Sequence, residues 1–216
     1  MSDLHQDHDH DHEPHDALED PEGAVTPHEI LEIALRELLI EKEVFTAAEV
    51  SRVIEALETR NESCGARLIS RIWTDPGFRR KALGNGKAAV EEELGFDMIE
   101  APELIVLENQ PKLHHVVVCT LCSCYPLQVL GASPTWYRSK EYRARVVREP
   151  RAVLAEFGTI LPDDVEIRVV DSTAEVRYLI VPMRPAGTEA WSRERLEGLV
   201  SRDSMIGVAQ ARPVDG

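Results

Sequence analysis

The first half of the chain carries apolar residues at helical spacing. Between residues 27 and 42 they recur every three or four positions, at Ile30, Leu31, Ala34, Leu35 and Leu38, which is typical of an amphipathic helix. Thr26-Pro27-His28-Glu29 precedes this run and has the form of a capping box with proline at the first helical position. Similar signals predict four further helices: one that begins at the capping box 46–49, one over about 63–73, a short one from Asp75-Pro76, and one over 88–94.

The second half changes to short runs rich in β-branched residues. We expect strands at 104–107, 115–118, 165–170 and 176–181, because such runs are typical of buried strands. Residues 138–157 have helical character, and their arginines are interpreted as a solvated face or as ion-pair partners. Ser192 is expected to cap a final helix through about Leu199. Helices followed by strands predict an α+β fold.

Composition indicates a single globular body of medium size. A chain of 216 residues with 43 % apolar content is long enough to bury a sizeable core. No apolar run reaches membrane-spanning length, and no secretory signal is visible, so we expect no membrane partner and a cytoplasmic location. The formal net charge of −15 argues against a nucleic-acid partner.

That charge is concentrated at the N-terminus. Residues 1–25 hold nine of the 39 acidic residues and no Lys or Arg, which leaves 30 acids against 24 bases in the remainder. Five histidines alternate with the acids, and almost nothing in this segment can be buried. We therefore predict a disordered tail, either a dispensable extension or a weak metal-binding segment.

The most informative stretch is a cluster of three cysteines after a run of valines. Cys119, Cys122 and Cys124 follow 116–118, and Pro126 prevents a regular helix from continuing through them. The thiols are therefore expected on an irregular loop at the end of a strand. The fourth, Cys64, lies far away in sequence and is interpreted as a small packed residue, so the few cysteines favour a reducing compartment.

Several kinds of site were weighed for these thiols. A disulfide framework is excluded because the number is odd and the residues are too close in sequence. A redox pair formed by Cys119 and Cys122 leaves Cys124 unexplained. Structural zinc usually needs a second ligand pair, and only His114 and His115 are near. A non-catalytic zinc module nevertheless remains an alternative.

A transition metal accounts for all three thiols. Three sulfurs together with the backbone nitrogens of Ser123 and Cys124 would supply five ligands and leave one position open, as catalytic metal sites do. We therefore interpret Cys119, Cys122, Ser123 and Cys124 as metal ligands. Arg177, on the last predicted strand, is expected to point toward this loop.

The cluster resembles a known motif. Val-Cys-Thr-Leu-Cys-Ser-Cys-Tyr at 118–125 resembles the metal-binding claw of the nitrile hydratase α subunit and of the related thiocyanate hydrolase γ subunit. The similarity covers about Thr26 to Val208, and it includes the segments 133–137, 142–151, 166–169, 184–189 and 202–208.

The resemblance implies a fold and an assembly. It implies a helical arm over 26–95 that contacts a β-type partner subunit, followed by a layered α-β-β-α catalytic body over 96–216. Arginines of that partner would complete the active site, and an activator protein is expected to load the metal. The segment 96–103 departs from the family, because it lacks the Gln-Gly-Glu usually found before the strand.

The resemblance also implies the cofactor. Cobalt(III) is expected, with iron(III) as the alternative, because Thr120 and Tyr125 match the cobalt-type pattern. Cys122 would be oxidised to a sulfinate and Cys124 to a sulfenate, whereas Cys119 would stay a thiolate. Cys124, Cys122 and Ser123 are then the catalytic residues, with Ser123 acting through its backbone nitrogen.

Two activities fit such a centre. The first is hydration of a nitrile to the amide, with the metal polarising the C≡N carbon while the Cys124 oxygen attacks it or activates a water. The alternative is the hydrolysis of thiocyanate to carbonyl sulfide and ammonia. After Tyr125-Pro126 this chain has Leu127-Gln128, where nitrile hydratases usually have Trp-Pro and thiocyanate hydrolases Arg-Pro. The loss of an arginine removes an attraction for a small anion, which with 184–189 favours nitriles.

Overall fold

The computed structural model describes residues 27–214, and the predicted tail over 1–25 lies outside this range. The chain divides into two compact units, with the boundary between Ser51 and Arg52. Helix α1 (Pro27–Glu41) and the start of α2 (Ala47–Glu58) belong to the first unit, and neither helix contains a buried residue. The predicted capping box at α2 is confirmed, since the Thr46 N–H donates to Glu49 Oε2 at 2.7 Å and the Glu49 N–H donates back to Thr46 Oγ1 at 3.2 Å.

Two parallel strand pairs form the centre of the second unit. β1 (Glu103–Glu108) pairs with β4 (Val176–Val181), and β2 (Leu113–Val118) pairs with β3 (Glu166–Asp171). The end of β2 is fully buried at Val116, Val117 and Val118, as expected for a β-branched run. The four predicted strands are therefore confirmed within two residues at each end.

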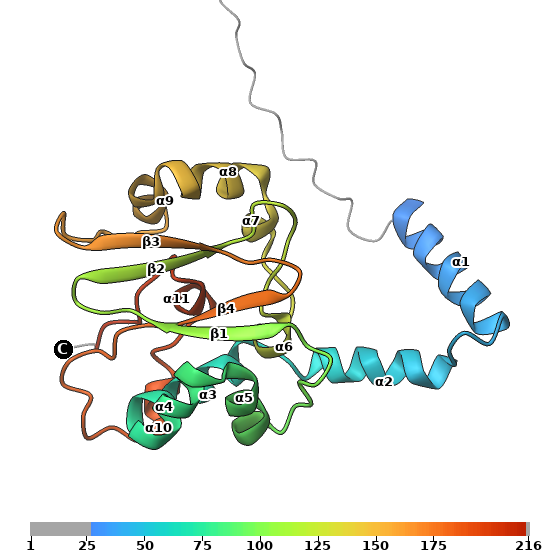
Figure 1. Ribbon diagram of the computed structural model, residues 1–216, viewed down its shortest axis with the longest axis horizontal. Helices are drawn as coiled ribbons and strands as arrows, with labels where there is room; N and C mark the ends of the chain where they lie inside the picture. The colour runs from blue at the N-terminus through green and yellow to red at the C-terminus, as the bar shows by residue number, and fades with distance from the viewer. Residues whose placement is uncertain (1–26, 215–216) are drawn as a thin grey trace, which may run out of the picture. The chain divides into compact units, whose positions relative to one another are not determined.

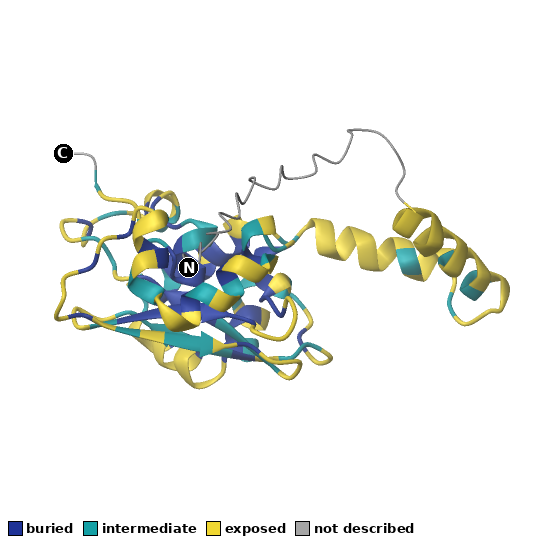
Figure 2. Cartoon of the chain, turned by 90° about the horizontal axis from the view of Figure 1, so that it is seen from above, coloured by how far each residue is buried: buried dark blue, intermediate teal, exposed yellow. Residues whose placement is uncertain are grey.

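Helices cover the outer faces of these two sheets, which gives the predicted α-β-β-α layers (Figure 1). On one side lie α3 (Glu62–Thr74), α4 (Pro76–Gly84), α5 (Gly86–Leu94) and α10 (Arg193–Glu197). On the other lie α8 (Lys140–Arg148) and α9 (Pro150–Glu156), while α11 (Arg202–Ile206) packs against β4 and α3. The buried residues of this unit lie in its interior, whereas its surface segments are largely exposed (Figure 2).

The structure corrects the helix predicted over 138–157. It is divided into α7 (Thr135–Arg138), α8 and α9. Ser139 caps α8, and Glu149 leaves the helical region at φ −139° and ψ 55°. The cause is Pro150, because the ring of a proline disfavours the helical conformation in the residue before it.

The end of the chain also differs from the prediction. Ser192 caps α10 as expected, but this helix ends at Glu197 and is not the last one. Ser201 forms a capping box with Ser204 and begins α11. A further short helix, α6 (Leu127–Leu130), follows the cysteine loop directly. Segments of four or five residues are too short to show a helical period, which is why they were missed.

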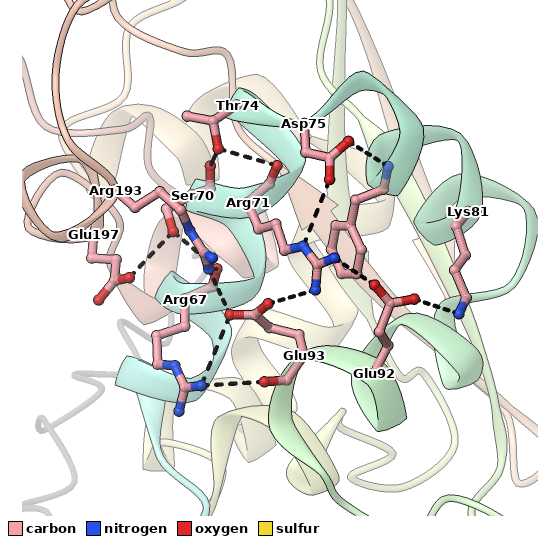
Figure 3. Close-up of polar contacts among 11 residues, drawn as sticks. Arg67, Ser70, Arg71, Thr74, Asp75, Lys81, Glu92, Glu93, Arg193 and Glu197 are labelled. Carbon is pink, nitrogen blue, oxygen red and sulfur yellow. Dashed lines mark hydrogen bonds and ion pairs between the residues drawn. The ribbon is translucent and has the colours of Figure 1, made fainter.

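An ion-pair cluster joins helices of the layer that contains α3, α4, α5 and α10 (Figure 3). Glu93 of α5 has a side chain only 7 % exposed, and it accepts hydrogen bonds from Arg71 of α3 at 2.9 Å and Arg193 at 2.5 Å. Helices α4 and α5 pack on β1, and α3 packs on α10. The unit that contains the strands therefore includes α3 to α5, which the sequence-based boundary at residue 95 assigned to the arm.

None of the helices described between residues 27 and 214 is long and apolar enough to cross a membrane.

Candidate metal centre

The cysteine loop begins directly after the C-terminal end of strand β2. Cys119 follows Val118 directly and is fully buried, whereas Cys122 is exposed on the loop. The neighbouring strand β3 anchors the start of the loop, because its last residue, Asp171, lies opposite Val118. The Asp171 carboxylate accepts hydrogen bonds from the Thr120 N–H at 2.9 Å and from Thr120 Oγ1 at 2.6 Å. The loop thus leaves the sheet in a fixed direction.

The structure brings the three predicted cysteine ligands together. Cys122 Sγ lies 3.4 Å from Cys119 Sγ and 3.1 Å from Cys124 Sγ, and all three sulfurs lie within 4.8 Å of one another. Within residues 27–214 this is the one group of three Cys, His, Asp or Glu side chains arranged to hold a metal ion. Three adjacent thiols suit a transition metal, since thiolates are soft ligands.

The two histidines considered for a zinc site do not join the cluster. His114 and His115 lie at the start of β2. The His114 ring donates from Nε2 to the Gly207 carbonyl at 2.7 Å, and its Nδ1 accepts from the Asn109 amide at 3.1 Å. The ring is therefore held neutral, and burial lowers its pKa. Both its nitrogens have structural partners.

The thiols of Cys122 and Cys124 have different electrostatic surroundings. Hydrogen bonds from the side chains of Cys124 and Cys119, followed by bonds from the backbone N–H groups of Cys124 and Ser123, lower the pKa of Cys122 to about 7. Burial and the neighbouring thiols raise the pKa of Cys124. Negative charge therefore appears on Cys122 before it appears on Cys124. The Cys122 N–H donates to the Cys119 sulfur at 3.3 Å, so the loop backbone contacts the cluster.

Side chains from later segments hold the loop by its carbonyl groups. Tyr137 Oη donates to the Cys124 carbonyl at 2.8 Å, and Arg143 Nη1 donates to the Cys122 carbonyl at 2.8 Å. Tyr142 Oη donates to the Val117 carbonyl at 2.7 Å, at the end of β2. On the other side, Arg177 Nε of β4 donates to the carbonyl of Tyr125 at 3.2 Å. The expectation that Arg177 points toward the loop is therefore confirmed.

The sequence interpretation missed the roles of Tyr137, Tyr142 and Arg143. Both tyrosines are buried beside charged neighbours, at 0 % and 5 % exposure. Their aromatic character in an otherwise polar helical segment was the available signal. Arg143 was counted with the solvated arginines, and nothing in its spacing distinguishes it from Arg145, which pairs with Glu149 and Glu156.

A cavity of about 610 Å³ lies beside the loop. Ser123, Tyr125 and Leu127 contribute one wall, and Ile54 and Leu57 contribute apolar side chains from the part of α2 that belongs to this unit. Arg60 and Arg138 supply the basic groups of its lining, and Glu58 an acidic one. The cavity opens next to the backbone that carries the predicted ligands.

Comparison with known proteins agrees with this arrangement. Residues 26–209 match the family model "Nitrile hydratase, alpha chain". The chain belongs to this family. It is 47 % identical over 188 residues to the α subunit of the high-molecular-weight cobalt-containing nitrile hydratase of Rhodococcus rhodochrous, covering 86 % of this chain and 92 % of that subunit. The resemblance to the nitrile hydratase α subunit is therefore confirmed, and the chain belongs to a family of enzyme subunits.

Thiocyanate hydrolase, which has a different activity, is also among the relatives, at a similar sequence identity. The chain is 44 % identical over 200 residues to the γ subunit of thiocyanate hydrolase from Thiobacillus thioparus, covering 88 % of this chain and 82 % of that subunit. A solved thiocyanate hydrolase with partially modified cobalt centres superposes with a TM-score of 0.82, at 44 % identity and coverage of 88 % and 92 %. A mutant of the iron-type nitrile hydratase of Comamonas testosteroni Ni1 gives a TM-score of 0.78, at 42 % identity and coverage of 86 % and 90 %. The thiol cluster and these relatives support a metal at the site.

Proposed function

We propose that this chain is the α subunit of a cobalt nitrile hydratase, which converts a nitrile into the corresponding amide. The observation that carries the proposal is the cluster of three sulfurs, which lie within 4.8 Å of one another on the loop that contains Ser123. In this proposal Cys119, Cys122, Ser123 and Cys124 hold a cobalt(III) ion. Similarity to cobalt-containing nitrile hydratases, together with Thr120 and Tyr125 in the loop, supports cobalt over iron(III).

The residues of the loop have different roles in the proposed reaction. When bound, the metal supplies Lewis acidity that makes the nitrile carbon electrophilic. Cys124, as a sulfenate, supplies the oxygen that attacks this carbon or takes the proton from an attacking water. Overall, one water adds across the C≡N bond, its oxygen going to carbon and its protons to nitrogen. Cys122 as a sulfinate and Cys119 as a thiolate keep the donor set anionic, and oxidation of Cys122 and Cys124 requires an external oxidant such as dioxygen.

The cavity beside the loop favours a nitrile over thiocyanate. Leu127 is 37 % exposed on its wall, and together with Ile54 and Leu57 it offers apolar surface to an organic side chain. A small inorganic anion gains nothing from such a surface. The basic groups of the lining are offset in part, because Arg60 stacks on the ring of Phe96 and Glu58 adds a negative charge.

The site is proposed to need other chains. Oxidised thiols are anionic and need donors, which arginines of a β-type partner subunit are proposed to provide. The exposed apolar residues of α1, such as Leu31 at 66 %, support a role of the helical arm in contacting that partner. We also propose an activator protein for metal loading and a cytoplasmic location.

Activity assays test the proposal directly. The chain is co-expressed with its partner subunit and activator in cobalt medium and assayed with an aromatic nitrile and with thiocyanate. Amide from the nitrile alone is the expected result. Carbonyl sulfide and ammonia from thiocyanate, without amide, would establish the thiocyanate hydrolase γ subunit instead.

Cysteine variants test the assigned ligands. Replacing Cys122 or Cys124 by Ser is expected to abolish cobalt incorporation and amide formation, because a hydroxyl is a poor substitute for a thiolate. Cys64→Ser is the matched control, since Cys64 lies in α3 outside the cluster. Full activity in Cys124→Ser would refute the mechanism. Zinc bound to unmodified thiols would indicate a structural module.

A further inference from the structure

Arg143 contacts the peptide unit that joins two of the proposed ligands. Its Nη1 donates to the carbonyl oxygen of Cys122 at 2.8 Å, and the nitrogen of that same peptide unit belongs to Ser123. Unlike Arg145 on the same helix, Arg143 forms no ion pair with a carboxylate among residues 27–214. Among the residues that the structure describes, the Cys122 carbonyl is the hydrogen-bond partner given for its guanidinium, and its Nε is buried without one.

The two ends of the peptide unit face opposite ways. A trans peptide is planar, with its carbonyl oxygen and N–H on opposite edges. The oxygen of Cys122 faces α8, where it meets Arg143, so the N–H of Ser123 points away from α8. Fixing the oxygen on one side thus fixes the nitrogen on the other.

We propose that Arg143 is the positioning residue for the Ser123 backbone nitrogen, which it orients toward the metal and makes a better ligand by polarising the Cys122–Ser123 peptide. The inference rests on the proposed metal centre. A charge-assisted hydrogen bond to the oxygen draws electron density away from the peptide and favours negative charge on it. The Cys124 carbonyl has a neutral donor, the Tyr137 hydroxyl, and the charged Arg177 donates to the Tyr125 carbonyl, which lies outside the proposed donor set. Arg143 therefore differs from the other groups that hold the loop by carrying a charge to a peptide of the donor set.

Three substitutions of Arg143 separate the effect of its positive charge from the effect of its hydrogen bond to the loop. Arg143→Lys keeps the charge, Arg143→Gln keeps a neutral donor, and Arg143→Ala removes both. Arg145→Ala is the matched control, because it removes the ion pairs of an arginine on the same helix without touching the loop. Each is prepared as the holoenzyme with the partner subunit, and metal per chain, the sulfur-to-metal charge-transfer absorption, melting temperature and kcat are measured.

Removal of an outer hydrogen-bond partner typically lowers metal affinity or activity by about 10- to 100-fold. We expect losses of this size in metal affinity for Arg143→Ala, with a shifted charge-transfer band, a smaller effect for Arg143→Gln and the smallest for Arg143→Lys. Arg145→Ala is expected to keep the metal content and the band. Wild-type metal content and an unchanged band in Arg143→Ala would overturn the inference, as would equal losses in Arg143→Ala and Arg145→Ala.

Failure of the proposed function gives a different result. If the wild-type holoenzyme carries cobalt but hydrates no nitrile, the substrate proposal fails, while metal content and absorption still decide the role of Arg143. If Arg143→Ala does not fold, the comparison of Arg143→Lys with Arg143→Gln decides it. A wild-type holoenzyme without bound cobalt or iron would overturn both proposals.

Discussion

Glu93 offers the sharpest test of what holds the helical layer together. Its side chain is 7 % exposed and lies between Arg71 of α3 and Arg193 at the start of α10 (Figure 3). Glu92, the next residue, also pairs with Arg71, at 2.5 Å, and with Lys81 at 2.6 Å, but its side chain is 38 % exposed. Truncation of Glu93 removes these two ion pairs and a longer one to Arg67, at 3.9 Å, whereas truncation of Glu92 removes two, so the variants differ chiefly in how buried the lost carboxylate is.

Burial decides the expected size of each effect. Each hydrogen bond to a charged group contributes about 1.5–3 kcal/mol, and breaking a buried pair costs about 3–5 kcal/mol. Arg71 keeps Glu92, and Arg193 is 37 % exposed and can regain water, so Glu93→Ala is expected near the lower end, at about 3 kcal/mol. Glu92→Ala should cost far less, because exposed pairs are screened by water.

Urea unfolding of the full chain measures both values. Circular dichroism follows the helices, and the difference in free energy of unfolding from wild type is compared between Glu93→Ala and Glu92→Ala. Glu93→Gln, which keeps the volume and one acceptor, should fall between Glu93→Ala and wild type. Equal costs for the two alanine variants would show that burial does not govern the cluster, and would refute the reasoning.

Other predictions concern the far end of β2. Gly207 has φ 86°, and a Cβ added to it would lie 2.0 Å from the His115 carbonyl oxygen. Gly207→Ala should therefore lower the melting temperature more than Gly187→Ala, because Gly187 has a similar φ of 79° but open space around it. Equal losses in melting temperature would show that the clash with His115 does not contribute. Because the pKa of His114 is depressed below its unfolded value of 6.5, the unfolded chain takes up protons first, and stability should fall as pH drops below that value. Urea unfolding at several pH values should show a shallower dependence in His114→Gln, and an unchanged one would contradict the assignment.

The sequence predicted those parts of the fold that local patterns determine. Runs such as 176–181 and the capping box at Thr46 depend on neighbours within a few residues, and both were located correctly. The division at Glu149 was missed although Pro150 was visible, because the helical character of the whole segment outweighed a single proline. The cysteines were identified as a cluster because all three lie within six residues.

The surroundings of the cluster could not be predicted in the same way. Tyr137 and Asp171 contact the loop only because the layers bring distant segments to the end of β2. Tyr137 lies 13 residues from Cys124 and Asp171 lies 51 residues from Thr120, and neither spacing follows a local period. A sequence pattern therefore locates the cysteine cluster, whereas the groups that hold its loop follow from the tertiary structure.

The conformation of the cysteine loop depends on residues that come later in the chain. The carbonyls of the loop are held by Tyr137, Arg143 and Arg177, and its start is held by Asp171, all of which follow the cysteines in the chain. In an unfolded chain the three thiols are close in sequence, but nothing turns the backbone nitrogens toward them. Since metal binding to a site that depends on the fold is coupled to the free energy of folding, the proposed donor set of nitrogen and sulfur requires the body to assemble as far as β4.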